Sequence, residues 1–265
     1  MQAMHSFKSF LKSGHGPTLF ASFLYFTFSC CVWVLNGAMA PFIGESFALS
    51  PAQQGLMLSI PIIAGALMRF PLGVLSQYIG RKNATLVEMA LVALALVFGL
   101  LFVRTFNDLL AMGGLLGIAG ASFGVALSLG AGWFAPQHKG LAMGLVGAGN
   151  VGTAVSVLLA PPLAQWLGWQ SVYGVAAVAM LLPMTVMVLF AKEPPDVNSR
   201  ASLREHVACL FEKDGWVFSL IYGVTFGGFI GLVSFLPTYY HDQFGVSKVQ
   251  AGQLTMLAAF MGAAV

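Results

Sequence analysis

The clearest pattern in this chain is a series of apolar stretches, each long enough to cross a membrane and each followed by a polar connection. Seven windows of about 20 apolar residues predict membrane-spanning helices: Thr18–Ile43, Gly55–Gln77, Ala84–Val103, Leu109–Phe134, Leu141–Leu163, Val172–Ala191 and Trp216–Tyr240. An eighth begins near Gln250 and is still apolar at Val265, so we expect an N-terminal part of a longer chain. Because spanning β-strands are only about 10 residues long and alternate in polarity, the pattern predicts an all-α integral membrane protein.

Composition agrees with a membrane protein, because 58% of the residues are hydrophobic and only 8% are charged. That leaves too little polar surface for a water-soluble protein. The three cysteines, Cys30, Cys31 and Cys209, have neither disulfide nor metal-ligand spacing, so we expect no metal site. The sequence contains no nucleophile–base pair and no phosphate-binding loop, which argues against an enzyme and against a cofactor. Basic residues are too sparse for a nucleic-acid binder.

The longest polar connection predicts the domain organisation. It covers residues 192–215 and separates a six-helix N-terminal bundle (1–191) from an incomplete C-terminal bundle (216–265). If the N-terminus is cytoplasmic, the outside loops hold only Arg104 and Lys248, and the inside loops hold the remaining loop cations: Lys8, Lys12, Arg81, Lys82, Lys139, Lys192, Arg200, Arg204 and Lys213. The positive-inside rule therefore predicts a multi-pass protein of the inner (plasma) membrane with a cytoplasmic N-terminus and a cytoplasmic linker.

Six helices, a charged linker and the start of a second set match transporters built from two six-helix halves, each with three-plus-three inverted repeats. The connection after the second window places Gly73, Gly80, Arg81 and Lys82 in an order that resembles the loop signature of the major facilitator superfamily. That family usually has Asp where this chain has Gln77. The resemblance implies a loop that takes part in gating, whereas the alternative is an ordinary basic cytoplasmic loop.

Arg69 lies near the middle of the second window, followed by Phe70 and Pro71. An arginine at that depth costs about 2.5–3.5 kcal/mol on insertion scales, so it should face a cavity and have a partner. No acidic residue is near it in the sequence, and an anionic substrate could take that place. The planar guanidinium can hold two oxygens of a planar oxyanion. The alternative is an arginine that snorkels to the interface or pairs with a loop.

Two glycine-rich stretches, residues 113–124 and 144–154, predict close helix packing. Phe123 is the one large aromatic side chain in the first and could form a cavity wall. Asn150 is a polar amide that must be hydrogen-bonded in a dry interior, either to a substrate anion or to a neighbouring Ser or Thr. Further along, Tyr222 and Phe226 are four residues apart and share a helix face, a spacing that is also common in ordinary cores.

Three features together resemble the nitrate/nitrite porter family of the major facilitator superfamily: Arg69 in its Arg-aromatic-Pro-Leu-Gly setting, the Gly-x-Gly-Asn-x-Gly of residues 147–152, and Tyr222 with Phe226. The resemblance implies that Arg69 binds the anion, Asn150 donates a hydrogen bond and Tyr222 contributes its hydroxyl. Phe123 and Phe226 would flank the anion, and Gly147 and Gly149 belong to the family's nitrate signature. The family's second substrate arginine lies in the eighth helix, and this chain stops before such a residue.

The sequence thus predicts a secondary transporter of nitrate or nitrite that rocks between two openings, with a small inorganic anion and the lipid bilayer as its partners. Anion exchange is favoured over proton coupling, because Glu88 and His241 are the only loose candidates for a proton site and both are badly placed. Another small-anion carrier, for example of a carboxylate, and a truncated protein that does not transport remain as alternatives. The sequence indicates neither the direction of transport nor the oligomeric state.

Overall fold

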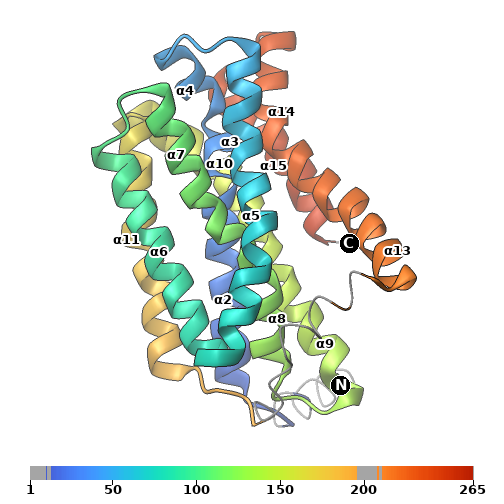
Figure 1. Cartoon of the computed structure of the whole chain (residues 1–265). Coiled ribbons are helices and arrows are strands. Elements are labelled where there is room, and N and C mark those ends of the chain that lie inside the picture. Colours follow the sequence, from blue (N-terminus) through green and yellow to red (C-terminus); the bar gives the residue numbers. More distant parts are fainter. Residues whose placement is uncertain (1–9, 11–12, 196–207, 209–210, 265) are drawn as a thin grey trace, which may run out of the picture.

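The computed structural model describes Phe10, residues 13–195, Ala208 and residues 211–264, and this part of the chain is helical without strands (Figure 1). Seven helices in it are long and apolar enough to cross a membrane: Gly16–Trp33, Pro51–Ile79, Arg81–Leu101, Phe106–Ala131, Pro136–Leu167, Trp169–Phe190 and Lys213–Phe244. Each overlaps one predicted window, and α15 (Lys248–Ala264) follows where the eighth is expected. The all-α membrane fold is confirmed. Most of the predicted linker 192–215 lies outside the described residues, as do Lys8, Lys12, Arg200, Arg204 and Cys209.

The first window differs from the prediction, because Thr18–Ile43 does not form one helix. α2 (Gly16–Trp33) ends at Trp33, and the chain continues as α3 (Leu35–Ala38) and α4 (Ala40–Ser46). Pro41, at the start of α4, has no backbone N–H to donate to the preceding turn. The break leaves Trp33 at the end of a helix.

Local sequence explains the ends of the second and third spans. Ser50 and Gln53 form a capping box at the start of α5 (Pro51–Ile79), which runs without a break through Pro61 and Pro71. Gly80, with φ +88°, then separates α5 from α6 (Arg81–Leu101). This positive φ favours glycine, since other residues are strained there.

Three of the later spans change helix type near their middle. η1 (Gly117–Ala121) is a 3₁₀ turn between α7 (Phe106–Leu116) and α8 (Ser122–Ala131). η2 (Ala148–Asn150) is a second 3₁₀ turn between α9 (Pro136–Gly147) and α10 (Val151–Leu167). η4 (Gly223–Gly227) is a π-helical turn between α13 (Lys213–Tyr222) and α14 (Gly228–Phe244). Such irregular turns inside helices are frequent at hinges and functional sites.

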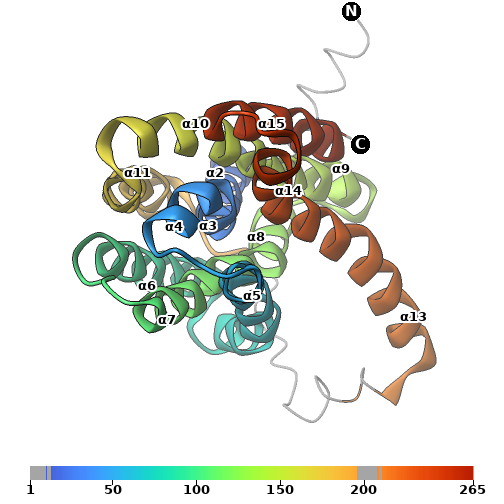
Figure 2. The same cartoon turned by 90° about the horizontal axis from the view of Figure 1, so that it is seen from above.

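α2 lies at the centre of the N-terminal bundle, surrounded by α8, α10 and α11 (Trp169–Phe190) (Figure 2). Glycines allow this close packing: a Cβ added at Gly149 would lie 2.9 Å from Phe26 Cδ1, and one at Gly152 would meet the carbonyl oxygen of Thr27. The glycine-rich stretch of the fifth span therefore packs directly on the backbone of α2, as its composition predicts.

The two ends of the molecule differ in how the C-terminal helices contact the N-terminal ones. We call the end that carries Arg81, Lys82, Lys139 and Lys192 the basic end, and the end that carries Glu45 and Lys248 the opposite end. α13 lies nearer the basic end than α14 does (Figure 1). It contains no buried residue and stands apart from the bundle (Figures 1 and 2). α14 and α15 instead pack against α3 and α10.

Candidate anion-binding site

Arg69 has the contacts expected of a buried cation without an acidic partner. Its side chain is half-buried; Nε donates to the carbonyl oxygen of Gly120 at 3.2 Å, and one terminal nitrogen donates to the Tyr222 hydroxyl at 3.0 Å. No ion pair involving Arg69 exists among the described residues. A guanidinium has five N–H donors, and two are used here, so three remain for a ligand.

Aromatic rings surround the guanidinium. Its Cζ lies 5.2 Å from the centre of the Tyr222 ring, 5.3 Å from Phe226 and 6.0 Å from Trp33, within the range of cation–π attraction. Tyr222 and Phe226 stack at 5.0 Å, and Phe123 stacks on both, at 6.1 and 5.8 Å. The structure therefore gathers four residues that the sequence singled out: Arg69, Phe123, Tyr222 and Phe226.

A cavity of about 470 Å³ begins at Arg69 and runs to the basic end of the bundle. It is lined by Arg69, Gly73, Ser76, Gln77, Arg81, Ala121, Phe123, Gly124, Val125, Ser128 and Tyr222. Its described lining includes two arginines and no carboxylate. Such a one-sided charge distribution attracts anions and repels cations.

Asn150 and the neighbouring Gly149 contact α2, one helical turn from the α2 residue that contacts Arg69. Cys30 donates from its Sγ to the Asn150 side-chain oxygen at 3.8 Å, and Trp33, one helical turn further along α2, contacts Arg69. Asn150 is half-buried, and its amide nitrogen donates to no described residue. Gly149 packs against α2, whereas nothing lies within 4 Å of a Cβ added at Gly147. None of the three lines the cavity at Arg69.

The predicted gating loop is held by a residue that the sequence analysis did not single out, Glu193. Its carboxylate accepts from the backbone N–H groups of Arg81 at 2.7 Å and Lys82 at 2.9 Å, and so satisfies the first donors of α6. The Lys82 ammonium donates to the carbonyl oxygens of Val188 and Ala191 at the end of α11. Gly80 has to be small here, because its Cβ would lie 3.1 Å from Glu193 Oε2. The loop is thus fixed to α11.

Comparisons with known proteins show the family to which the chain belongs. The family described as Major Facilitator Superfamily matches residues 21–265. The chain belongs to the Major Facilitator Superfamily, a family of membrane transport proteins. The resemblance of the Gly73–Lys82 loop to its signature is thereby explained.

Within the superfamily, curated relatives carry names that refer to nitrate or nitrite. The chain is 31% identical over 225 residues to "Nitrite extrusion protein" of Bacillus subtilis, covering 84% of this chain and 56% of the relative. It is 33% identical over 225 residues to "Probable nitrate transporter NarT" of Staphylococcus haemolyticus, with 83% and 57% covered. The corresponding values for "Probable nitrate/nitrite transporter NarK2" of Mycobacterium tuberculosis are 31%, 88% and 60%. The chain thus spans somewhat more than half of the length of these relatives.

Solved structures of superfamily members share the fold. A bacterial homologue of the human lysosomal transporter Spinster, described as inward-facing and unoccupied, aligns with a TM-score of 0.72 at 24% identity, covering 92% of this chain and 60% of that one. The human organic anion transporter MFSD10 aligns with a TM-score of 0.71 at 17% identity, covering 94% and 70%. At these identities the likeness concerns the fold alone.

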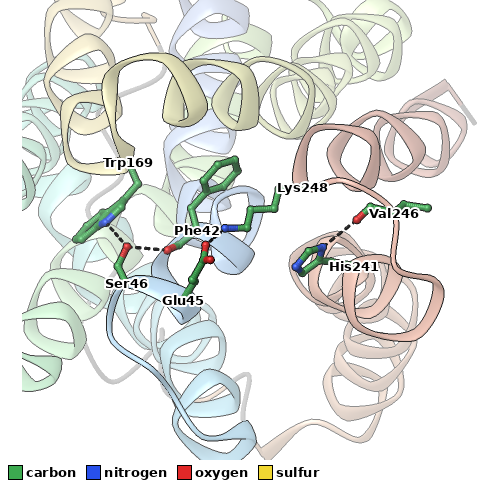
Figure 3. A network of polar contacts seen from close by, with 7 residues as sticks. All are labelled: Phe42, Glu45, Ser46, Trp169, His241, Val246 and Lys248. Atoms are coloured by element: carbon green, nitrogen blue, oxygen red, sulfur yellow. Dashed lines mark hydrogen bonds and ion pairs between the residues drawn. The ribbon is translucent and has the colours of Figure 1, made fainter.

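Neither loose candidate for a proton site lies in the cavity of this superfamily member. Glu88 is fully buried in α6, with both carboxylate oxygens lacking a hydrogen bond within the described part of the chain, and it does not line the cavity. His241 lies at the opposite end, where its Nδ1 contacts the carbonyl oxygen of Val246 at 2.8 Å (Figure 3). In the described ranges no group of three or more His, Cys, Asp or Glu side chains could hold a metal ion.

Proposed function

We propose that the complete protein exchanges nitrate and nitrite across the inner membrane, using Arg69 as the principal anion ligand. The observation that carries this proposal is a half-buried arginine with three unused N–H donors at the inner end of a cavity without described carboxylates. A guanidinium matches a planar oxyanion, because two parallel N–H groups can bind two of its oxygens. The names of the relatives point to the same anions.

The aromatic side chains favour a small flat ligand. Phe123 and Tyr222 line the cavity beside Arg69 with nearly parallel rings, 23° apart. The faces of these two rings limit the space beside the guanidinium, and the guanidinium stays open towards the cavity. A small carboxylate would have to place its carbon chain against these rings, so we consider it the second candidate. The unused amide nitrogen of Asn150, whose side chain contacts α2 one helical turn before Trp33, is a further donor for the anion after a shift of α2 or η2.

Exchange follows from the charge of the empty site. A buried cation is unfavourable in a low-dielectric interior, and a bound anion neutralises it. A carrier that changes conformation only when this charge is neutralised returns loaded rather than empty, which is exchange. No described carboxylate or histidine lines the cavity to carry a proton with the anion.

The two ends of the molecule support alternating access. By the positive-inside rule the basic end, where the cavity opens, is cytoplasmic. At the opposite end the Lys248 ammonium of α15 forms an ion pair with Glu45 of α4 and lies 4.8 Å from the centre of the Phe42 ring (Figure 3). Nearby, a Cβ added at Gly37 would lie 2.8 Å from Ser234 Cα, so α3 and α14 touch through their backbones. These contacts would have to separate for the anion to leave at that end.

The test is nitrate counterflow in liposomes that contain the complete protein and trapped nitrite. We expect nitrite-dependent nitrate uptake, and its loss by about 100-fold in Arg69→Lys, because an ammonium cannot make the two parallel hydrogen bonds of a guanidinium. Arg104→Lys is the matched control, since Arg104 is an exposed arginine in the connection before α7.

Uptake in Arg69→Lys equal to that of the unaltered protein would contradict the assigned role of Arg69. Nitrate uptake that needs a proton gradient and no internal nitrite would contradict exchange. Uptake of acetate or formate in place of nitrate would favour the carboxylate carrier, and no uptake of any of these anions would favour a protein that does not transport.

A further inference from the structure

Trp33 lies behind Arg69, and neither the sequence patterns nor the resemblance assigned it a role. It is the last residue of α2 and is 6% exposed. Its indole Nε1 donates to the carbonyl oxygen of Pro61 in α5 at 2.8 Å. Its ring stacks on Phe226 at 6.2 Å, and Arg69 Cζ lies 6.0 Å from its centre. Trp33 thus connects α2 to α5, which carries Arg69, and to η4 of the C-terminal half.

Two glycines make room for this indole. A Cβ added at Gly65 of α5 would lie 2.9 Å from the indole Nε1, and one at Gly120 of η1 would lie 2.6 Å from the same atom. Real side-chain carbons do not approach so closely, so a residue larger than glycine at either position would displace the ring. The indole is therefore wedged between α5 and η1.

This wedge sits beside the hydrogen bond that orients Arg69. Gly120, the residue of η1 that packs against the indole, also provides the carbonyl oxygen that accepts from Arg69 Nε at 3.2 Å. The spacing between α5 and η1 consequently decides whether this bond forms. A buried arginine that loses one partner turns towards another, and its remaining N–H donors change direction with it.

Trp33 also closes the site on one side. The cavity that begins at Arg69 is not lined by Trp33 or by Phe226. Both rings nevertheless lie within cation–π distance of the guanidinium. Because the rings cover it there, the open edge of the guanidinium is directed to the cavity.

We propose that Trp33 is a positioning residue for the anion site. By holding the Arg69 guanidinium in one orientation, it sets the preference for planar oxyanions over tetrahedral ones. This inference rests on the proposed function. It concerns geometry and not charge, because Trp33 contributes one N–H donor, and Pro61 already accepts it. A guanidinium of fixed orientation matches the coplanar oxygens of nitrate better than the tetrahedrally arranged oxygens of perchlorate.

The experiment compares Trp33→Phe with Trp169→Phe in the counterflow assay. The Trp169 indole also donates one hydrogen bond, to Ser46 Oγ at 3.1 Å, but it lies at the opposite end, and both members of that bond belong to the N-terminal half (Figure 3). We expect Trp33→Phe to raise KM for nitrate about tenfold while kcat changes less than about threefold, because it loosens ligand orientation without removing Arg69. Inhibition by perchlorate should become stronger relative to that by nitrate. Trp169→Phe should leave KM and this selectivity unchanged.

A second pair of variants approaches the wedge from the other side. Gly120→Ala pushes on the indole, and Gly114→Ala, on the same span, meets only Ile60 Cγ2 at 3.9 Å. We expect Gly120→Ala to reproduce the rise in KM and the altered selectivity, and Gly114→Ala to change neither. If Trp33→Phe does not accumulate in the membrane, this pair decides the question.

Unchanged KM and selectivity in Trp33→Phe would overturn the role of Trp33. If Trp33→Phe does not accumulate in the membrane, the same result in Gly120→Ala would overturn it. A fall in kcat for nitrate, with KM and the inhibition by perchlorate unchanged, would indicate a role in stability alone and would also overturn it. Absence of nitrate counterflow in the unaltered protein is a different result, because it contradicts the proposed function itself.

Discussion

The two ends of this molecule differ in the contacts between the first six spans and the helices that follow them. At the opposite end, α3 and α14 touch through Gly37 and Ser234, α15 packs on α10 through Gly252 and Pro161, and an ion pair joins α4 to α15. Towards the basic end, α13 has no buried residue, and a cavity lies between it and the N-terminal bundle. Between the two ends, Arg69 and Tyr222 form a hydrogen bond across the halves.

The contact at the opposite end therefore depends on backbone packing, whereas the central connection depends on Arg69, the proposed anion ligand. Backbone contact through glycine is rigid and permits two discrete states, docked or separated. The Arg69–Tyr222 bond is the one that an arriving anion can compete for. Breaking these connections one at a time should separate their contributions.

The largest effect is expected from Gly37→Leu, which places a side chain against the backbone of Ser234. Overpacking costs about 1–3 kcal/mol and cannot be relieved here by turning a side chain, so the docked state should be depopulated by up to about 100-fold. Thiol labelling of a cysteine placed at Ser234 should become fast in the variant, and nitrate exchange should fall strongly.

Gly55→Leu is the matched control, because nothing lies within 4 Å of a Cβ added at that residue, which is near the same end of α5. Equal labelling rates in the two variants would mean that α3 and α14 are already separated in the membrane.

Tyr222→Phe should have the next largest effect. It removes the hydroxyl that accepts from Arg69 at 3.0 Å and keeps the stacked ring. A hydrogen bond to a charged group contributes about 1.5–3 kcal/mol, and part of this returns when the anion takes the freed donor. We therefore expect KM for nitrate to change by about three- to tenfold, with the direction set by whether the hydroxyl also binds the anion.

A rise in KM would place the Tyr222 hydroxyl among the anion ligands, and a fall would make it a competitor of the anion. Tyr239→Phe serves as the control, because Tyr239 is exposed and distant from Arg69 in the chain. Unchanged affinity in Tyr222→Phe would contradict a site at this arginine.

How far the sequence predicted this arrangement depends on the range of each interaction. The spans, Arg69 and the Tyr222–Phe226 stack follow from local patterns, since depth in a window and a spacing of four residues are visible without the fold. Trp33 and the Gly120 carbonyl were missed because their role arises where α2, α5 and η1 meet. Glu193 was missed because its partners are backbone groups more than 100 positions away. The glycines around Trp33 were a signal, but composition alone did not tell which side chain they accommodate.

The smallest effect is expected at the ion pair of Lys248 and Glu45. The Glu45 side chain is 74% exposed, and exposed ion pairs contribute about 0.2–1 kcal/mol, so Lys248→Gln should change the exchange rate no more than about fivefold. Reversal of both charges, Glu45→Lys with Lys248→Glu, should restore the rate. If each single reversal slows exchange and the double reversal does not restore the rate, Lys248 acts through its contact with the Phe42 ring instead.

A reversible cross-link across the opposite end decides whether the two ends open alternately. In a protein with Cys30→Ser, Cys31→Ser and Cys209→Ser, Glu45→Cys and Lys248→Cys would be joined by a short reducible thiol reagent and nitrate exchange followed. Ser46→Cys with Trp169→Cys is the control, because that pair lies at the same end but within the N-terminal half. We expect the first cross-link to stop exchange, its reduction to restore exchange, and the control cross-link to have no effect. Unchanged exchange while the thiols introduced at Glu45 and Lys248 are joined would contradict alternating opening of the two ends.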